Sequence, residues 1–234
     1  MSKKAWIIFA VVCATLLAVL VYVSNKDRVD VSSVDTNAIQ SGSEQSGAIA
    51  DNVFGKADSK VILVEYGDFQ CPGCEQAYSH VKKITEKYKD YSAFVFRNYP
   101  IVSKHPNARA AAAAAEAAGM QGKYWEMHSM LYENQLRWGN LTAKERTDFF
   151  AGYAKDLGLN PDTFKTDFAS PRVNQKISFD QAVGKKANVS ATPTIILNGK
   201  AIDQEIWSDD SKFEAAFIDA FKEKGITVPA DVKE

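Results

Sequence analysis

The amino-acid sequence predicts one α/β domain, carried on an N-terminal transmembrane helix. Two observations predict the domain: buried-strand patterns lie at both of its ends, and a long helical section separates them. The order along the chain is β-α-β, then a helical block, then β-β-α. A third observation, an uninterrupted apolar run near the N-terminus, predicts the membrane helix.

The apolar run covers residues 5–23 (AWIIFAVVCATLLAVLVYV) and follows a short N-terminus of residues 1–4. As a helix it is about 28 Å long, close to the thickness of a bilayer core. A cleaved signal peptide is the alternative, but its apolar region is shorter and ends in a small-x-small site, which Val21-Tyr22-Val23 lacks. Lys3 and Lys4 favour a cytoplasmic N-terminus, so membrane lipid is the expected partner of 5–23 and the domain is expected outside the cytoplasm.

A polar linker is expected from residue 24 to residue 52. Its composition turns to Ser, Asp, Asn, Gln and Gly, as in SGSEQSG at 41–47, without a sustained apolar period. We therefore expect a flexible tether over 24–52 and a folded domain over 53–234.

The first half of the domain follows a strand, helix, strand pattern. Val61–Tyr66 is almost continuously apolar, as in a strand that is buried on both faces, and Gly67-Asp68 ends it. A helical pattern runs from Cys71 to about Tyr88, and residues 91–98 (YSAFVFRN) form a second strand. Such a unit usually pairs its strands in parallel through a right-handed crossover.

Helices dominate the middle of the chain, over about residues 103–186. The patterns predict helices at 107–120, 123–133, 143–156, 161–168 and 173–186. Beyond them, Thr194–Leu197 is a predicted strand, Asn198-Gly199 a two-residue hairpin turn, and residues 200–206 the antiparallel partner. A helix with an apolar stripe, from about Ser211 to Lys224, closes the domain.

The segment Cys71-Pro72-Gly73-Cys74 lies where the first strand meets the first helix. Residues three apart on a helix share one face, close enough for a disulfide, and Pro72 suits the first helical position. At the helix N-terminus Cys71 meets unpaired N–H groups and the helix dipole, which stabilise a thiolate. The pattern predicts a redox-active disulfide, with Cys71 as the exposed nucleophile and Cys74, one turn deeper, as the resolving cysteine.

Two other uses of a C-x-x-C pair remain open at this point. Half of a zinc site needs further ligands, for which the chain offers only His80, His105 and His128. A purely structural disulfide would close a very small loop and so restrict the unfolded chain little. We therefore expect no metal, and no cofactor other than the Cys71–Cys74 disulfide itself.

Charge and cysteine usage restrict the partners and the compartment. The formal net charge is −1, so there is no basic surplus and no nucleic-acid partner is expected. Outside the apolar run, the only cysteines are the two of the motif. Such a lack of additional cysteines is typical of a protein in an oxidising compartment, where further free thiols would form wrong disulfides.

The element order and the position of the C-x-x-C resemble the thioredoxin fold of the DsbA-like (DsbA and BdbD type) thiol–disulfide oxidoreductases. The segments that carry the resemblance are VEYGDFQCPGC at 64–74, HPNARAAAAAAEAAGMQGKYWEMHSMLYENQ at 105–135, and Ala191-Thr192-Pro193-Thr194. It covers about residues 53–225. The resemblance implies a thioredoxin fold whose two halves are separated by a helical insertion at about 103–186.

The resemblance also implies roles for site residues. Pro193 matches the family's cis-proline, which would present the backbone of Thr192 beside the disulfide for a substrate strand. Glu65 matches the acidic residue beneath the active site and is expected to relay a proton for Cys74; a position at a sheet edge, paired with Lys or Arg, is the alternative. Pro72 and Gly73 are expected to tune the redox potential, since strongly oxidising relatives often carry Pro-His, whose imidazole helps to hold a thiolate.

Three functions are compatible with these features. We favour a bacterial, membrane-anchored extracytoplasmic oxidase that donates its disulfide to folding exported proteins and is reoxidised by a quinone-linked membrane partner of the DsbB or VKOR kind. A reductase or isomerase, and a non-catalytic binding or chaperone module, are the alternatives. The large side chains Trp125, Met127, Met130 and Trp138 line either a peptide-binding surface or the core.

Overall fold

The computed structural model describes residues 2–26, 29–228 and 232. The chain divides into two compact units, Met1–Asp30 and Val31–Glu234, and each is described by itself. Expectations that concern Met1, residues 27 and 28 of the linker, and residues 229–231, 233 and 234 of the domain lie outside the described residues.

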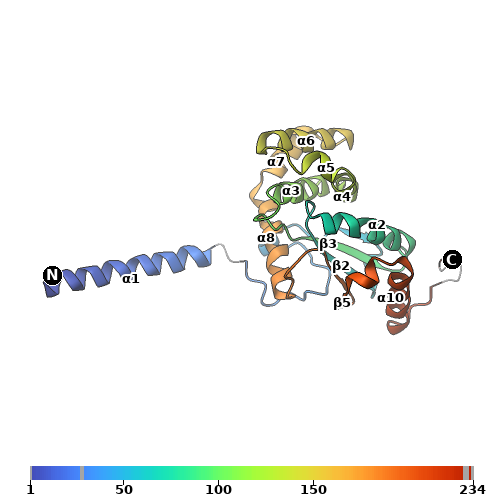
Figure 1. The fold of residues 1–234 in the computed structure, drawn as a ribbon, viewed down its shortest axis with the longest axis horizontal. Helices are drawn as coiled ribbons and strands as arrows, with labels where there is room; N and C mark the ends of the chain where they lie inside the picture. Colours follow the sequence, from blue (N-terminus) through green and yellow to red (C-terminus); the bar gives the residue numbers. More distant parts are fainter. Residues whose placement is uncertain (1, 27–28, 229–231, 233–234) are drawn as a thin grey trace. The chain divides into compact units, whose positions relative to one another are not determined.

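Over the described residues 2–26, 29 and 30, the first unit contains one helix, α1 (Lys3–Lys26), which includes the expected span of residues 5–23 (Figure 1). Its apolar side chains are exposed, as shown by Trp6 at 60% and Leu20 at 65%. Over Lys3–Leu20 it is long and apolar enough, by length and composition, to cross a bilayer.

The second unit is built around a five-stranded sheet in the order β1-β3-β2-β4-β5. The strands are β1 (Val53–Gly55), β2 (Ile62–Gly67), β3 (Ala93–Asn98), β4 (Thr194–Leu197) and β5 (Lys200–Ile202). Strands β2 and β3 are parallel, with Val64 opposite Val95, and the other neighbours are antiparallel. The predicted β-α-β and β-β-α halves are confirmed, whereas β1 was not expected.

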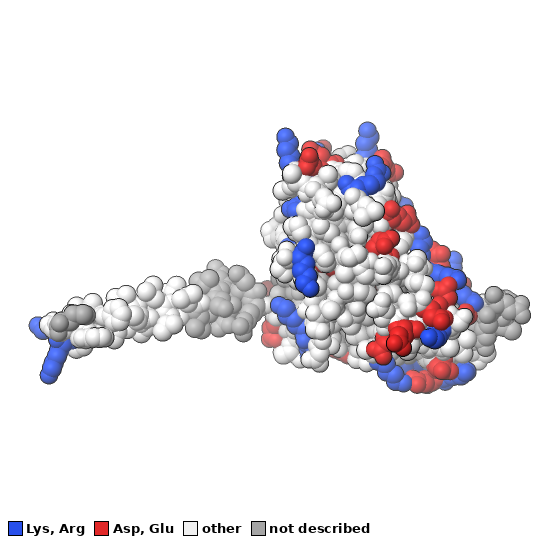
Figure 2. Space-filling model, in the orientation of Figure 1, with Lys and Arg blue, Asp and Glu red and all other residues white. Residues whose placement is uncertain are grey.

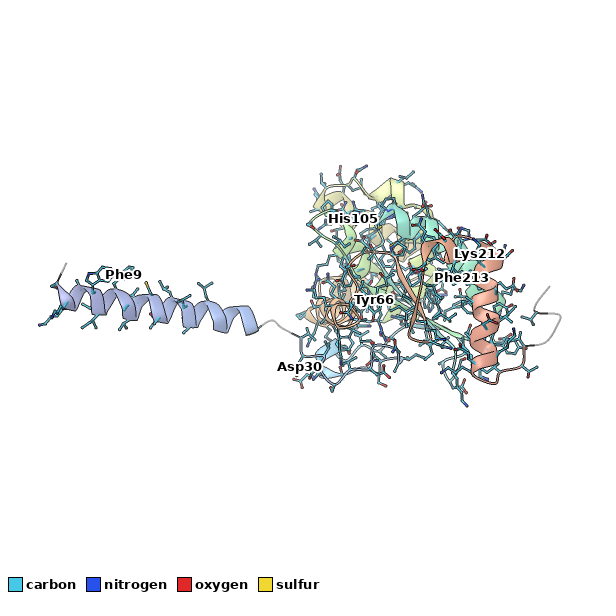
Figure 3. The ribbon with its side chains drawn as sticks, turned by 60° about the horizontal axis from the view of Figure 1, so that its bottom comes forward. Phe9, Asp30, Tyr66, His105, Lys212 and Phe213 are labelled. Carbon is cyan, nitrogen blue, oxygen red and sulfur yellow. The ribbon has the colours of Figure 1, made fainter. Side chains whose placement is uncertain are left out.

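Helices cover both faces of the sheet (Figure 1). Glu65 of β2 lines a cavity together with residues of α2 (Pro72–Lys87), which packs with α10 (Asp210–Glu223). The next residue, Tyr66, points to the opposite face, where Gly184 of α8 (Pro171–Lys186) lies against it. Figure 3 shows Tyr66 inside the unit and Phe213 on α10. On the face seen in Figure 2, acidic and basic side chains are interspersed.

The helical insertion joins β3 to β4. Its members before α8 are α3 (Ala108–Gly119), α4 (Tyr124–Glu133), α5 (Gln135–Trp138), α6 (Ala143–Asp156) and α7 (Pro161–Phe168). Helix α3 contacts α4, α6, α7 and α8, and its alanines are buried almost completely. The alanine-rich segment is therefore a core helix, as its high helix propensity predicts.

The second strand of the C-terminal hairpin is shorter than expected. Strand β5 ends at Ile202, and a short helix, α9 (Gln204–Trp207), replaces the rest of the predicted strand 200–206. Trp207 is only 5% exposed. The burial of this ring turns the segment into helix, and a period-two reading of the sequence did not anticipate it.

The expected linker of residues 24–52 is wrong over most of its length, because residues 31–52 belong to the second unit. They carry the 3₁₀ helix η1 (Glu44–Ser46). Buried Arg97 donates to the carbonyls of Thr36 and Ala38 and to the Tyr66 hydroxyl, and it pairs with Asp51 at 2.9 Å. Asp51 also pairs with buried Lys176 at 2.9 Å. These polar residues satisfy buried charges, so their polarity does not indicate disorder.

Candidate active site at the start of helix α2

The two cysteines of the motif lie at the N-terminus of α2, where β2 has just ended. Cys71 has extended backbone and is the N-cap, and Pro72 begins the helix. Both cysteines are free thiols; Cys71 is 9% exposed and Cys74 is 0% exposed. The predicted order of depth is therefore present, although Cys71 is more covered than an exposed nucleophile was expected to be.

The surroundings of Cys71 favour its thiolate. A hydrogen bond from the Cys74 thiol is the largest cause that lowers the pKa of Cys71 from 9.0 to about 5. Partial burial opposes the shift, and Thr192 and the backbone N–H groups of Cys74 and Gly73 add to it. A helix N-terminus with unpaired N–H groups has this effect on a thiol. At neutral pH the sulfur of Cys71 is therefore a nucleophile.

The surroundings of Cys74 instead favour its protonated thiol. Burial raises its pKa well above 9.0, and its hydrogen bond to Cys71 and the negative charges of Glu65 and Cys71 raise it further. The backbone N–H of Asp68 lies 3.5 Å from its sulfur and partly offsets the shift. Cys74 therefore holds its proton until a base accepts it or a disulfide forms.

The Thr192–Pro193 peptide bond is cis, and the loop that contains it lies beside the motif. The Cys71 Sγ is 3.4 Å from the Thr192 carbonyl oxygen, to which the thiol donates. A Cβ built on Gly73 would lie 3.4 Å from the Pro193 Cδ, so residue 73 faces this loop. The buried Thr192 Oγ1 makes no hydrogen bond within the described residues while Cys71 is a thiol, but it can donate to the Cys71 thiolate and so lowers the pKa of Cys71.

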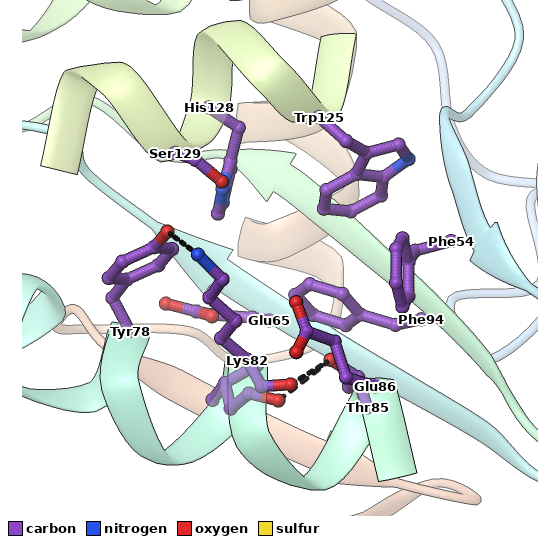
Figure 4. A pocket seen from close by; sticks show the side chains of 11 residues that line it. Phe54, Glu65, Tyr78, Lys82, Thr85, Glu86, Phe94, Trp125, His128 and Ser129 are labelled. Carbon is purple, nitrogen blue, oxygen red and sulfur yellow. Dashed lines mark hydrogen bonds between the residues drawn. The ribbon is translucent and has the colours of Figure 1, made fainter. Parts of the chain in front are cut away.

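Glu65 lies in central strand β2 and is 1% exposed, so the alternative of a sheet-edge position is wrong. Burial, followed by the charge of Cys71, raises its pKa from 4.5 to about 8. Its Oε1 has no partner within the described part of the chain. Glu65 lines a cavity of about 50 Å³. Figure 4 shows its carboxyl on the same side as Tyr78, Lys82 and His128, which also line this cavity. The carboxyl group is therefore neutral near pH 7 and faces space that can hold water.

The other large side chains considered in the sequence analysis have different positions. Met127 and Trp138 are 0% exposed and belong to the core. Met130 is partly buried against the core, and Trp125 lines the cavity above Glu65. Across the described residues, no group of three His, Cys, Asp or Glu side chains is placed to hold a metal ion.

Sequence reasoning missed the residues that hold the loop in front of Cys71. The carboxylate of Asp68 is fully buried and accepts hydrogen bonds from His105 Nδ1 and from the backbone N–H of Ile101, both at 2.8 Å. The side-chain amide of Gln135 donates to the carbonyl of Cys71 at 3.0 Å. One indication of these supports was present in the sequence: His105 and Gln135 are the first and last residues of segment 105–135, which resembles the family.

Comparison with known proteins agrees with this geometry. The family model described as Thioredoxin matches residues 48–219. Among solved structures, BdbD from Bacillus subtilis (oxidised) is 26% identical, with a TM-score of 0.65, and the match covers 79% of this chain and 98% of that one. A thioredoxin-like oxidoreductase from Silicibacter pomeroyi is 25% identical, with a TM-score of 0.60, over 74% and 92% of the two chains.

A curated relative, Na(+)/H(+) antiporter NhaA 1 of Salinispora arenicola, is 39% identical over 150 residues, which make up 64% of this chain and 22% of that protein. The chain thus spans about a fifth of the length of the curated relatives it matches. The family match covers most of the second unit, and the structural matches extend over nearly all of the two solved chains. The chain therefore belongs to the thioredoxin family, and its second unit is similar in fold to BdbD and to the thioredoxin-like oxidoreductase.

Proposed function

We propose that the protein is a membrane-anchored, extracytoplasmic thiol–disulfide oxidase that donates its Cys71–Cys74 disulfide to exported proteins. The contrast between the two sulfurs supports this activity. The pKa of Cys71 is lowered to about 5, whereas the pKa of buried Cys74 is raised. Stabilising the Cys71 thiolate stabilises the reduced protein, which makes its disulfide a better oxidant.

The exchange takes two steps. A thiolate of the substrate attacks Cys71 Sγ, the Cys71–Cys74 bond breaks, and Cys74 leaves with the electron pair and takes up a proton. The second thiolate of the substrate then attacks the substrate sulfur of the mixed disulfide, which forms the substrate disulfide and releases Cys71 as a thiolate. The substrate loses two electrons and the protein gains them.

Glu65 is proposed as the proton donor for Cys74. Its carboxyl carries a proton near pH 7, because burial raises its pKa to about 8, and its charge acts on Cys74. In the reverse direction the carboxylate accepts the proton of Cys74. The cavity next to Glu65 supplies space for water through which the carboxyl regains its proton.

Thr192 and Pro193 are proposed to bind the substrate backbone. The cis bond turns the chain so that the Thr192 carbonyl lies beside the Cys71 sulfur. An extended substrate segment that pairs with this backbone would bring its cysteine to Cys71 by strand addition. Pro72 and Gly73 remain the proposed tuning pair, because they occupy the first turn that faces the sulfur.

The anchor and the partners extend this proposal. Helix α1 is apolar over Lys3–Leu20 and would hold the enzyme at the membrane, with its N-terminus in the cytoplasm. An oxidase needs an acceptor for its two electrons, and a quinone-linked membrane protein of the DsbB or VKOR kind would provide one at the same membrane. No cofactor other than the cysteine pair is proposed.

The reduction potential of the pair tests the direction of electron flow. Reference proteins with thiol pKa values of about 7 and about 3.5 have potentials of about −270 and about −120 mV, so a pKa of about 5 predicts a potential between these two references. Equilibration of the full chain with glutathione, followed by thiol labelling, measures it. A value near that of the −270 mV reference would contradict the oxidase and favour the reductase.

Trapping in cells tests the reaction itself. In the Cys74→Ala variant the mixed disulfide on Cys71 lacks its resolving thiol and should accumulate with exported proteins. The Cys71→Ala variant is the matched control and should trap nothing. If neither variant forms mixed disulfides, the non-catalytic module is favoured instead.

A further inference from the structure

The segment that leads into Cys71 is bonded to the helical insertion on two sides. This active-site loop, residues 68–71, runs from the end of β2 to the start of α2. The side-chain amide of Gln135 donates to the carbonyls of Phe69 at 2.9 Å and of Cys71 at 3.0 Å. Gln135 is 9% exposed and begins α5, so both its backbone and its amide are fixed in place.

A second link holds the same loop at the other end of α5. The Gln70 side-chain amide donates to the Gly139 carbonyl at 2.6 Å, and its oxygen accepts from the Asn107 N–H at 2.7 Å. The Asn107 side chain donates in turn to the carbonyls of Trp138 and Leu141. Helix α5 is thus fastened to the active-site loop by residues at both of its ends.

The Cys71 carbonyl connects Gln135 to helix α2, because it accepts hydrogen bonds from both. It accepts the first two hydrogen bonds of α2, from the N–H of Cys74 at 3.1 Å and of Glu75 at 3.2 Å, as well as the amide of Gln135. These bonds set the orientation of the first turn. The same turn carries the N–H groups of Gly73 and Cys74, which act on the Cys71 sulfur.

We propose that Gln135 is a positioning residue for disulfide exchange, which holds the Cys71 peptide so that the N–H groups of the first turn of α2 face the sulfur. The proposal rests on the proposed function and assigns part of it to the insertion. Gln135 does not touch the sulfur; it acts through the backbone of Phe69 and Cys71. The short helix α5 is then needed for the chemistry as well as for packing.

A merely structural role for Gln135 makes a different prediction. Loss of its amide leaves the Phe69 carbonyl without this donor, which lowers stability whether or not the sulfur is affected. Only a positioning role also changes the ionisation of Cys71. The pKa of Cys71 therefore separates the two roles, and the melting temperature does not.

The test compares Gln135→Met with Gln121→Met in the full chain. Methionine has nearly the same length and no N–H donor. Gln121 also bridges two segments of the insertion, since it bonds the backbone of Asn160, but it does not contact the active-site loop. The measurement is the rate of Cys71 alkylation by iodoacetamide as a function of pH, with Cys74→Ser as the common background.

We expect Gln135→Met to raise the pKa of Cys71 by about one unit, so that alkylation at pH 5 slows about fivefold, and Gln121→Met to leave both unchanged. An unchanged pKa in folded Gln135→Met overturns the proposal. If that variant does not fold, Gln135→Asn, which keeps the amide but withdraws it by one methylene, is measured in the same way. An unchanged pKa there overturns the proposal as well.

The readout needs no substrate, so it is independent of the proposed oxidase activity. A protein that fails to trap substrates but shows the pKa shift retains the positioning role and loses the proposed function. A protein that traps substrates but shows no shift retains the function and loses the role of Gln135.

Discussion

The hydrogen bond between the two thiols gives a sharp prediction, because serine can replace Cys74 without removing the donor. The Cys74 thiol is the largest cause of the lowered pKa of Cys71, which lies at about 5 instead of 9.0. A hydrogen bond to a charged group contributes about 1.5–3 kcal/mol, and about 1.4 kcal/mol corresponds to one pKa unit. Removal of this donor should therefore raise the pKa of Cys71 by about one to two units.

The two variants to compare are Cys74→Ala and Cys74→Ser. The alanine variant has no donor, so its Cys71 should titrate at about 6–7, whereas the serine hydroxyl should keep the pKa near that of the wild type. At pH 5 the alanine variant should then react with iodoacetamide about five- to fiftyfold more slowly than the serine variant. Alkylation rates between pH 3 and pH 9, with mass spectrometry to confirm the site, give both values.

Equal midpoints in the two variants would refute this reasoning. In that case the backbone N–H groups of the first turn of α2, with the helix dipole, would account for the whole shift. The low pKa would then belong to the helix terminus and not to the pair of sulfurs.

Four further predictions concern the residues around the two cysteines and the charged residues of the second unit. Thr192→Val removes a hydroxyl that lowers the pKa of Cys71, so that pKa should rise by about one unit in the same alkylation assay. Glu65→Gln should slow the release of mixed disulfides in stopped-flow measurements and remove a titration near pH 8 from the pH–rate profile; an unchanged profile would exclude the relay. Burial raises the folded-state pKa of Glu65 on β2 and of buried Glu116 on α3 to about 8, above the unfolded value of 4.5. Protonation of these two groups therefore contributes stability that is fully present below pH 4.5 and is lost as the pH rises to about 8. Urea unfolding should show each group contributing a fall of about 1.4 kcal/mol per pH unit in that window, and a steeper fall in the wild type than in Glu65→Gln. Asp51→Asn breaks a buried pair and should cost about 3–5 kcal/mol, whereas Asp219→Asn, at an exposed pair, should cost at most about 1 kcal/mol in the same experiment.

The elements whose residues carry a local pattern were predictable from the sequence. The apolar run of β2, the helical period of α2 and the Asn198-Gly199 turn each depend on neighbours in the chain, and the structure has all three. The place of Cys71 as the N-cap of α2 follows from the same local rules, since Pro72 suits the first helical position.

The missed elements depend on distant partners. Strand β1 forms because β3 offers it an edge, with Val53 opposite Val95, and three residues are too few to show a period. Residues 31–52 were read as a tether because they are polar. Their order comes from Arg97 and Lys176, which lie far along the chain and are buried without any local sign of it.

The supports of the active site were hidden for the same reason. A glutamine in a polar stretch such as Asn134-Gln135 gives no sign that its amide reaches a carbonyl 64 residues away. Asp68 could be read only as the residue that ends a strand, yet its carboxylate binds His105 and the backbone of Ile101. The spacing of the motif identifies the two cysteines, but only the tertiary structure identifies the residues that hold the loop in front of them.

The run of alanines in α3 has a mechanical consequence. Ala111, Ala114, Ala115, Ala117 and Ala118 are all 0% exposed, and methyl groups fill the space between this helix and its neighbours. Backbones that approach so closely have little room to slide, because any larger side chain would overlap the opposite helix. We therefore expect the helical insertion to move as one rigid unit. Substitutions should be tolerated mainly on its solvent-exposed side, as along α6, whose polar residues are mostly exposed.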